Sequence, residues 1–321
     1  MKVIKNILDI EENLQKSYVA IGNFDGLHTG HRTIIKRAME RAKEKDGVSI
    51  VFTFQNHPME LLRKDGRSVK YINTNEEKLF MLEKMGVDYV VLQPFTQDFA
   101  DLTPLEFVRL LKNKLGVEEI FVGFNFSFGK GGVAKTKDLV YLGEGEGIYV
   151  HEFKAITSGE DVISSTLIRK SMMTGEFERA LKLLGHPMIV IGEVIHGKKI
   201  ARKLGFPTAN IQIKDRLYPP FGIYGAKLQI EGEDQIRYGV INVGVNPTLK
   251  PGEFSLEVHI LNFDEDIYGK KMYIELMEYL RTEEKFDSVE ELVACIANDV
   301  AVWTKRSEEL KDGCCIKIGE F

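Results

Sequence analysis

Short apolar runs alternate with longer amphipathic segments through the first half of the chain. The apolar runs favour β-structure and lie at residues 18–21, 49–54, 88–92, 119–122 and 148–153. The segments between them repeat apolar residues with helical spacing, most clearly at 31–44, 74–85 and 103–116. Strands that alternate with helices in this way are typical of βαβ units. We therefore expect this half to be an α/β domain with a parallel sheet and helices on both faces.

Two of the expected helices carry start signals. Thr74 stands three residues before Glu77, which is the spacing of a capping box. Thr103 is followed by Pro104 and then by Glu106, so this threonine is a candidate N-cap with proline at the first helical position.

The pattern changes near Gly185. Strand-like runs separated by glycine- and proline-bearing turns replace the helical spacing, at residues 188–194, 222–230, 236–243, 254–261 and 271–279. This order is typical of an all-β fold, either a small antiparallel barrel or a sandwich. A terminal helix is expected at 288–303, because Leu292, Ile296 and Val300 form one apolar stripe. We place the boundary near Gly185 and expect two domains, 1–184 and 185–321.

Composition narrows the class of protein. A length of 321 residues agrees with two domains. The chain has 43 Lys and Arg against 48 Asp and Glu, a net charge of −5, which excludes a generally basic nucleic-acid-binding protein. The cysteines are three in number without CxxC spacing, which is no disulfide framework. No apolar run approaches the roughly 18 residues of a membrane span, and acidic residues interrupt the N-terminal segment. We expect a cytoplasmic protein without nucleic-acid or membrane partners.

The loop after the first strand is the first candidate site, because ligands of parallel sheets bind at the carboxyl ends of the strands. Its glycines allow close backbone approach, and the following helix N-terminus favours phosphate. His28 and His31 are three apart and face one side of that first turn. Both could stabilise charge on a nucleotide α-phosphate and a leaving pyrophosphate. The alternatives are a zinc pair, for which no further ligands are evident, and surface histidines without a role.

A glycine-bounded basic loop in the second half runs into a strand. Thr208 and Asn210 lie two apart, so their side chains share one face of an extended segment. A hydroxyl and an amide oxygen can hold Mg²⁺ beside ATP phosphates. Lys198, Lys199 and Arg202 could close over the same phosphates. The alternative is that Pro-Thr-Ala-Asn forms a plain turn.

Three segments of the first half resemble prokaryotic FAD synthetases. The run GNFDGLHTGH at 22–31 resembles the FDGxHxGH form of the HxGH nucleotidyltransferase signature. VGFNFSFGKG at 122–131 and ISSTLIR at 163–169 resemble two further motifs of that family, in the same order. The resemblance implies a Rossmann-like nucleotidyltransferase domain in which His28 and His31 are catalytic.

The same resemblance implies two sets of binding residues. The first set binds ATP and its phosphates and consists of Gly22, Phe24, Asp25, Gly30, Ser164, Ser165 and Arg169. The second set binds flavin and consists of Asn125, Phe126 and Phe128. The alternative for the aromatic residues is that Phe124, Phe126 and Phe128 alternate into the core of a sheet.

The second half resembles riboflavin kinases. GFPTAN at 205–210 resembles the signature of that family, and the segments at 222–224, 239–248, 256–261 and 266–269 match it in order. The resemblance implies a small antiparallel β-barrel with a terminal helix. It also implies that Glu257 is the general base and that Arg281 contacts the flavin. By the same resemblance, Lys198 and Arg202 bind phosphate, and Thr208 and Asn210 bind the metal.

Two observations stand beside this resemblance. On spacing alone, Glu257 is an outward-facing strand carboxylate. Ala201 stands where the family usually has glycine, and an alanine loses access to positive φ, which would alter closure of the basic loop.

Taken together, the motifs resemble the bifunctional riboflavin kinase/FAD synthetase family. The resemblance implies that ATP with Mg²⁺ phosphorylates riboflavin to FMN, and that AMP transfer from ATP to FMN then gives FAD and pyrophosphate. ATP, riboflavin and FMN are the partners, with FMN and FAD as intermediate and product rather than prosthetic groups. One alternative is an FMN adenylyltransferase whose barrel only binds flavin. Another is a nucleotide-binding module or an HxGH enzyme with a different acceptor. The sequence leaves a homo-oligomer open.

Overall fold

The computed structural model describes residues 1–10, 14–62, 69–197, 201, 204–213, 216–245, 254–313 and 318–319. The chain packs as two compact units. The first comprises Met1–Lys70 with Lys78–Ser165, and the second comprises Tyr71–Glu77 with Thr166–Phe321. Residues 166–184 therefore pack with the second unit, as does a short segment from the first half of the sequence. The functional division into 1–184 and 185–321 stays a prediction.

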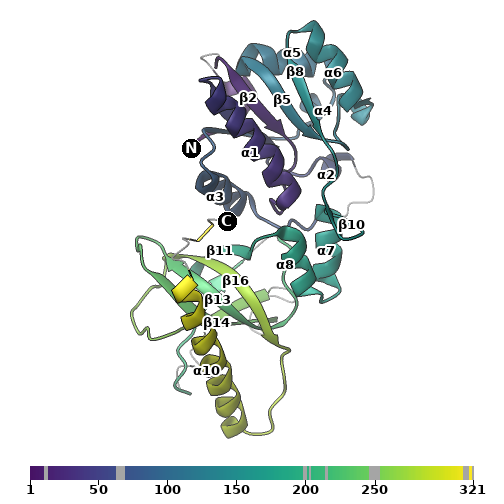
Figure 1. The fold of residues 1–321 in the computed structure, drawn as a ribbon. Helices are drawn as coiled ribbons and strands as arrows, with labels where there is room; N and C mark the ends of the chain where they lie inside the picture. The colour runs from purple at the N-terminus through teal and green to yellow at the C-terminus, as the bar shows by residue number, and fades with distance from the viewer. Residues whose placement is uncertain are drawn as a thin grey trace. The chain divides into compact units, whose positions relative to one another are not determined.

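The first unit is built on a six-stranded parallel sheet (Figure 1). In spatial order its strands are β1 (Lys2–Ile4), β4 (Tyr89–Gln93), β3 (Val48–Phe54), β2 (Ser17–Ile21), β5 (Val117–Gly123) and β8 (Tyr149–Phe153). The order reverses at β2, because β3 and β4 follow on one side of it and β5 and β8 on the other. In open α/β sheets such a reversal creates the crevice in which ligands bind.

Helices cover both faces of this sheet. They are α1 (Thr29–Glu44), α2 (Pro58–Leu62), α3 (Asn75–Met85), α4 (Gln97–Ala100), α5 (Pro104–Leu115) and α6 (Thr136–Gly145). Side chains alternate between the faces of a strand. Glu119 on β5 contacts Arg41 of α1, whereas Ile120 lies in the hydrophobic core with Phe107 of α5. The expected parallel sheet with helices on both faces is confirmed.

Short elements complete the first unit. They are the 3₁₀ turns η1 (Ile7–Asp9) and η2 (Lys130–Gly132), the hairpin of β6 (Ser127–Phe128) with β7 (Ala134–Lys135), and the hairpin of β9 (Thr157–Ser158) with β10 (Asp161–Val162).

Both expected helix starts are confirmed. The Thr103 hydroxyl accepts from the Glu106 N–H, and the Glu106 carboxylate accepts from the Thr103 N–H at 2.8 Å. Thr74 and Glu77 exchange the same two bonds, at 2.8 and 3.2 Å. The helix α5 ends at Gly116, whose φ of 58° is left-handed and therefore suits glycine.

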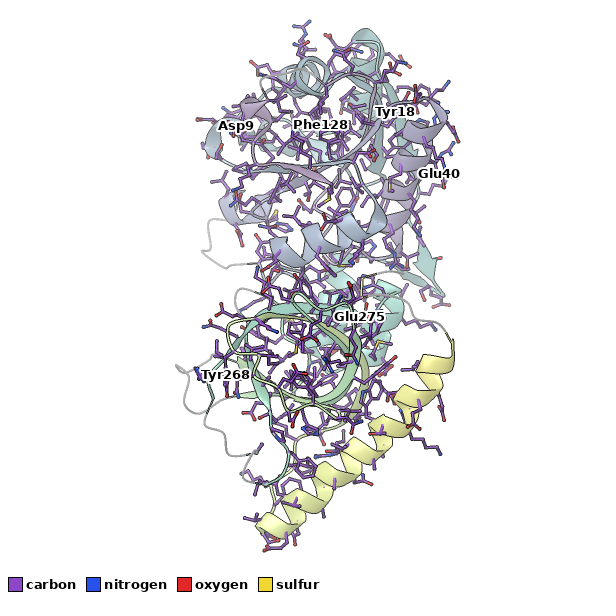
Figure 2. The ribbon with its side chains drawn as sticks, turned by 90° about the vertical axis from the view of Figure 1, so that its left-hand side faces the viewer. Asp9, Tyr18, Glu40, Phe128, Tyr268 and Glu275 are labelled. Carbon is purple, nitrogen blue, oxygen red and sulfur yellow. The ribbon has the colours of Figure 1, made fainter. Side chains whose placement is uncertain are left out.

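The second unit is a closed antiparallel barrel. In spatial order its strands are β11 (Met188–Ile195), β12 (Ala209–Gln212), β15 (Phe254–Ile260), β14 (Ile236–Val245), β13 (Gly222–Ile230) and β16 (Lys271–Arg281). Figure 2 shows these strands as a ring, with Glu275 of β16 labelled on its wall. Of the two expected all-β folds, the barrel is therefore the one that forms.

Among the residues that the structure describes, three helices with defined bounds pack with the barrel unit. They are α7 (Ser165–Met173), α8 (Phe177–Leu184) and α10 (Val289–Gly313). Trp303 of α10 is buried, and its indole N–H donates to the Ala226 carbonyl at 3.3 Å. A Cβ at Gly225 would collide with this indole, so glycine is needed there. The helix α10 extends ten residues beyond the expected end at 303, because its last turns lie past the apolar stripe that revealed it.

A buried ion pair holds the segment Tyr71–Glu77 in the second unit. Glu77 and Arg216 are both 0% exposed and contact each other directly. The guanidinium also donates to the carbonyls of Ile189 and Ile72, each at 2.9 Å, and the Ile191 N–H donates to Glu77 at 3.1 Å. No helix among the described residues is both long and apolar enough to cross a membrane.

Candidate active sites

The loop between β2 and α1 lies at the reversal point of the sheet and has an unusual backbone. Phe24, Gly26 and Leu27 all have positive φ, at 47°, 85° and 41°. Only the middle position is glycine, so the loop holds two side chains in a conformation that L-residues rarely adopt. Phe24 and Leu27 are almost fully buried, and their packing offsets this backbone strain.

The loop ends on the two histidines. His28 is the N-cap of α1, and its Nδ1 accepts from the His31 N–H at 3.4 Å. The two rings stack with centroids 3.6 Å apart, and Phe24 meets His31 edge-on at 5.3 Å. Both rings therefore lie at the positive end of a 16-residue helix, where phosphate is favoured. This geometry supports the phosphate interpretation.

Two of the site glycines leave room for these rings. A Cβ at Gly22 would approach the Phe24 ring to 3.1 Å, and one at Gly30 would approach the His28 ring to 3.2 Å. Among the described residues, no group of three or more His, Cys, Asp or Glu is placed to hold a metal ion. The zinc interpretation of the histidine pair therefore gains no support.

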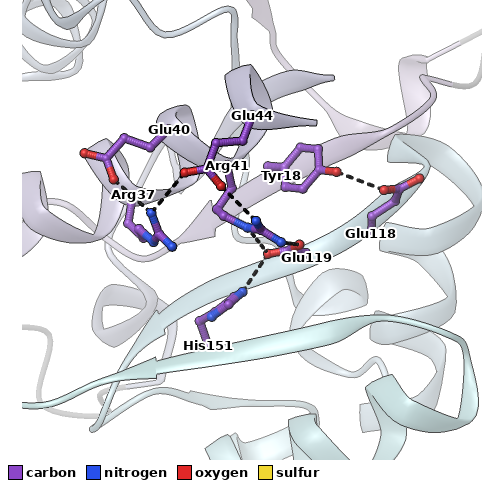
Figure 3. Close-up of polar contacts among 8 residues, drawn as sticks. All are labelled: Tyr18, Arg37, Glu40, Arg41, Glu44, Glu118, Glu119 and His151. Carbon is purple, nitrogen blue, oxygen red and sulfur yellow. Dashed lines mark hydrogen bonds and ion pairs between the residues drawn. The ribbon is translucent and has the colours of Figure 1, made fainter. Parts of the chain in front are cut away.

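A charged network joins α1 to the sheet at a place other than that of His28 and His31. Figure 3 shows its residues. Arg41 donates from Nε to Glu119 at 3.0 Å and also contacts Glu44, while His151 of β8 bonds to Glu119 at 2.6 Å. Burial acts to raise the pKa of Glu119, but the hydrogen bonds from Arg41 and His151 outweigh it and hold that pKa below its usual range. Burial and the bond to Glu118 raise the pKa of Tyr18 to about 12. We interpret this network as one that stabilises the fold rather than as part of the candidate site.

The motif segment at 163–169 lies partly beside the histidine loop. The Ser165 hydroxyl donates to the Asp25 carbonyl at 2.8 Å, so this segment contacts the histidine loop. Ser164 precedes α7, and Arg169 lies on α7 among the residues that pack with the barrel unit. Their phosphate-binding roles stay predictions.

The loop after β5 carries the expected flavin residues. Asn125 is exposed and follows directly on the end of β5. Phe126 is half-buried and stacks on Phe128 at 5.6 Å, and Phe128 packs on Phe107 within the core, where Figure 2 labels it. Phe124 is 49% exposed. The core alternative therefore describes Phe128 but not Phe124, and the flavin-binding roles stay predictions.

The barrel brings Asn210 and Glu257 together. They are direct partners across β12 and β15, and Asn242 of β14 is the partner of Glu257 on its other side. Side chains opposite each other in antiparallel strands lie about 5 Å apart. The neighbours Leu256 and Val258 are fully buried in the barrel, so Glu257 points to the outer face. The carboxylate does face outward, as spacing alone indicated, but it lies among amides.

This cluster suits a hard cation beside phosphate. Asn242 Oδ1 is buried and accepts no hydrogen bond from the described residues. Asn210 and Glu257 add an amide and a carboxylate oxygen from the adjacent strands, and oxygen donors of this kind are those that Mg²⁺ takes. The residues present therefore fit the metal that the sequence implies. Thr208 is two residues before Asn210 and half-buried, and its role stays a prediction.

Two contacts shape the segment that carries Thr208 and Asn210. The Pro207 carbonyl accepts from His259 Nδ1 at 2.9 Å. A Cβ at Gly197 would collide with the Asn210 amide, so the basic loop leaves its strand in direct contact with that side chain. Ala201 has a helical conformation, and its carbonyl accepts from the N–H groups of Leu204 and Phe206. An alanine adopts that conformation without strain. Lys198, Lys199 and Arg202 lie outside the described residues.

Arg281 is occupied by a structural contact. Its guanidinium binds both carboxylate oxygens of Asp299 on α10, at 2.9 and 2.7 Å, and donates to the Thr282 carbonyl at 2.9 Å. The bond to Asp299 raises the pKa of this arginine. The residue therefore holds α10 against β16, and its flavin contact stays a prediction.

Sequence reasoning missed two residues at these sites. Asn242 stood inside a matched motif, but its neighbours were not evident because β12, β15 and β14 are distant in sequence. Lys78 lies under the histidine loop, where its ammonium donates to the Asn23 carbonyl at 3.0 Å. The sequence offered one sign of this residue. Lys78 shares the buried stripe of α3 with Met81 and Leu82, and lysines are seldom fully buried.

Comparisons with known proteins agree with the family resemblance of both halves of the chain. A family model described as FAD synthetase matches residues 10–167, and one described as riboflavin kinase matches residues 184–306. A bifunctional riboflavin kinase/FMN adenylyltransferase from Listeria monocytogenes is 39% identical over 88% of this chain and 89% of that protein. The protein of the same name from Escherichia coli K12 is 35% identical over 93% of this chain and 96% of that protein.

A solved structure matches over nearly the whole chain. It is a crystal structure from Streptococcus pneumoniae described as a macrolide-efflux protein, with 30% identity and a TM-score of 0.82. It covers 94% of this chain and 98% of its own. With relatives above 30% identity along most of their length and both family models in order, the chain belongs to the family of bifunctional riboflavin kinases/FMN adenylyltransferases.

Proposed function

We propose that the two units catalyse consecutive reactions with the residues placed above. The barrel unit phosphorylates riboflavin to FMN with ATP, and the sheet unit joins FMN to the AMP part of a second ATP. One observation carries the proposal: in each unit, the motif residues converge on one place. His28 and His31 stack at the reversal point of the sheet, and Asn210 and Glu257, which come from separate motifs, pair on adjacent barrel strands.

In the sheet unit, an oxygen of the FMN phosphate attacks the α-phosphorus of ATP. The new bond joins that oxygen to the α-phosphorus, the bond from the α-phosphorus to the bridging oxygen breaks, and pyrophosphate leaves with that electron pair. His28, His31 and the N-terminus of α1 stabilise the charge on the α-phosphate and the leaving group. Ser164, Ser165 and Arg169 are proposed to bind the remaining phosphate oxygens.

In the barrel unit, Glu257 takes the proton from the ribityl 5′-hydroxyl as that oxygen attacks the γ-phosphorus of ATP. ADP leaves as the bond to its bridging oxygen breaks. Thr208 and Asn210 on one side of the carboxylate and Asn242 on the other are proposed to orient the phosphates. A Mg²⁺ ion held by these oxygen atoms would neutralise phosphate charge. The pairing of Asn210 with Glu257 on adjacent strands favours this reaction over a barrel that only binds flavin.

Two variants test the assignment with both products followed by chromatography. Glu257→Gln should stop FMN formation from riboflavin and ATP but still convert added FMN to FAD. His28→Ala should have the opposite effect. If Glu257→Gln still forms FMN at the wild-type rate, the kinase site is elsewhere; if His28→Ala still forms FAD at that rate, the adenylyltransferase site is elsewhere.

A further inference from the structure

Lys78 is buried beneath the loop that carries the histidines. The side chain enters from α3 and is 3% exposed. Its ammonium donates to the carbonyl of Asn23 at 3.0 Å, to the Thr53 hydroxyl at 3.3 Å and to the carbonyl of Phe54 at 3.4 Å. Two of these acceptors belong to the end of β3 and one to the histidine loop itself.

This lysine is a poor choice for stability alone. Burial lowers the pKa of Lys78 to about 8, although the charge of Asp25 acts to raise it. Asp25 is 2% exposed, so the partner charge is buried as well. A methionine in the same stripe as Met81 and Leu82 would fill similar space without the cost of removing a charge from water.

The position of the Lys78 ammonium indicates that it holds the start of the histidine loop. Thr53 also donates to the Asn23 carbonyl, at 3.0 Å, so two side chains hold the same oxygen. Asn23 comes directly before Phe24, the first residue of the loop with positive φ. Four residues after Phe24 the chain reaches His28. A contact that fixes the start of this turn therefore fixes the direction in which both imidazole rings point.

We propose that Lys78 is a positioning residue for adenylyl transfer, which holds the loop 22–27 so that His28 and His31 face the reacting phosphates. The inference rests on the proposed role of the histidines. A positioning residue acts on the transition state more than on flavin binding. Small displacements of catalytic groups cost about 100-fold in rate, so its loss should lower kcat of FAD formation and leave the KM for FMN nearly unchanged.

The test compares Lys78→Met with Lys84→Met, a substitution of the same kind on the same helix. Lys84 lies in the last turn of α3, over the Phe80 ring at 5.4 Å. We expect Lys78→Met to lose at least about tenfold in kcat for FMN to FAD, with KM for FMN within about twofold. Riboflavin phosphorylation by the same variant should be unchanged, and its melting temperature should equal or exceed that of wild type. Lys84→Met should resemble wild type in all four measurements.

A double-mutant cycle with Thr53→Val separates positioning from independent packing. If Lys78 and Thr53 act through the Asn23 carbonyl, the double variant should be no slower than Lys78→Met within about twofold. Full additivity, a wild-type kcat in Lys78→Met, or a lower melting temperature in that variant would each overturn the inference. If His28→Ala keeps its FAD synthesis, the proposed function itself fails; if only Lys78→Met keeps it, this inference alone fails.

Discussion

Asn210 and Glu257 lie directly opposite each other on adjacent strands of the barrel, although they are 47 residues apart in sequence. The pairing joins the GFPTAN segment to the carboxylate of the next motif. A proposed metal ligand and a proposed general base are thereby fixed by the backbone register itself. Changes that move the Asn210 amide should therefore impair phosphoryl transfer without unfolding the barrel.

Gly197→Ala makes such a change, because the added methyl group would collide with the Asn210 amide. We expect a loss of at least about tenfold in kcat for FMN formation, with FAD formation from added FMN unaffected. Gly145→Ala is the control, since a methyl group there meets no atom within 4 Å. A Gly197→Ala variant with wild-type kinase kinetics over a range of Mg²⁺ concentrations would remove Asn210 from the site.

The ion pair of Glu77 with Arg216 predicts that a residue from the first half of the sequence stabilises the barrel unit. Glu77→Gln leaves the guanidinium buried without its counter-charge, which costs about 3–5 kcal/mol. Trp303 is the one tryptophan and is buried in that unit, so its fluorescence reports the unfolding. The neighbouring Glu76→Gln removes an exposed bond to Lys271 and should cost less than about 1 kcal/mol. Equal effects of the two substitutions would contradict the assignment of this segment.

The buried Lys78 predicts how the stability of the first unit depends on pH. Its pKa is about 8 in the folded chain against 10.5 for an unperturbed lysine. Between these values the unfolded chain binds more protons than the folded chain, so the free energy of unfolding rises with pH. The full difference corresponds to about 3 kcal/mol. Asp25, the charged group that acts on this ammonium, opposes the shift.

Amide hydrogen exchange in β2 and β3 measures this rise. Wild type should gain stability relative to Lys78→Met between pH 8 and pH 10.5. Other titrating groups are common to both proteins and cancel in the difference. A difference that stays constant over this range would mean that the Lys78 ammonium titrates in the folded chain as it does in water.

Much of this fold follows from local patterns. Buried β-rich runs such as 49–54 and capping pairs such as Thr103 with Glu106 announce their elements because the interactions lie within a few residues. The strand Ala209–Gln212 was expected only as the extended end of the basic loop, without bounds, since it has four residues and gains its stability from β11 and β15. Barrel closure depends on similarly distant pairings, so sequence left a sandwich open.

The site residues also differ in how far the sequence reveals them, depending on whether their partners are near or distant in the chain. His28 and His31 could be found because one helix turn holds both rings. The contacts of Lys78 and the grouping of Asn242 with Glu257 depend on chain segments that meet only in the folded protein. Arg281 shows the converse: a motif position can be occupied by a structural bond, here to Asp299, that the motif does not reveal.

The most direct test of the two-site account is a mixing experiment with Glu257→Gln and His28→Ala. Each variant alone, given riboflavin and ATP, should yield no FAD: the first because it makes no FMN, the second because it cannot adenylylate FMN. Mixed in one vessel, the two should produce FAD after a lag in which FMN accumulates. If either variant alone converts riboflavin to FAD at the wild-type rate, or the mixture forms none, the division of the reactions between the two units is wrong.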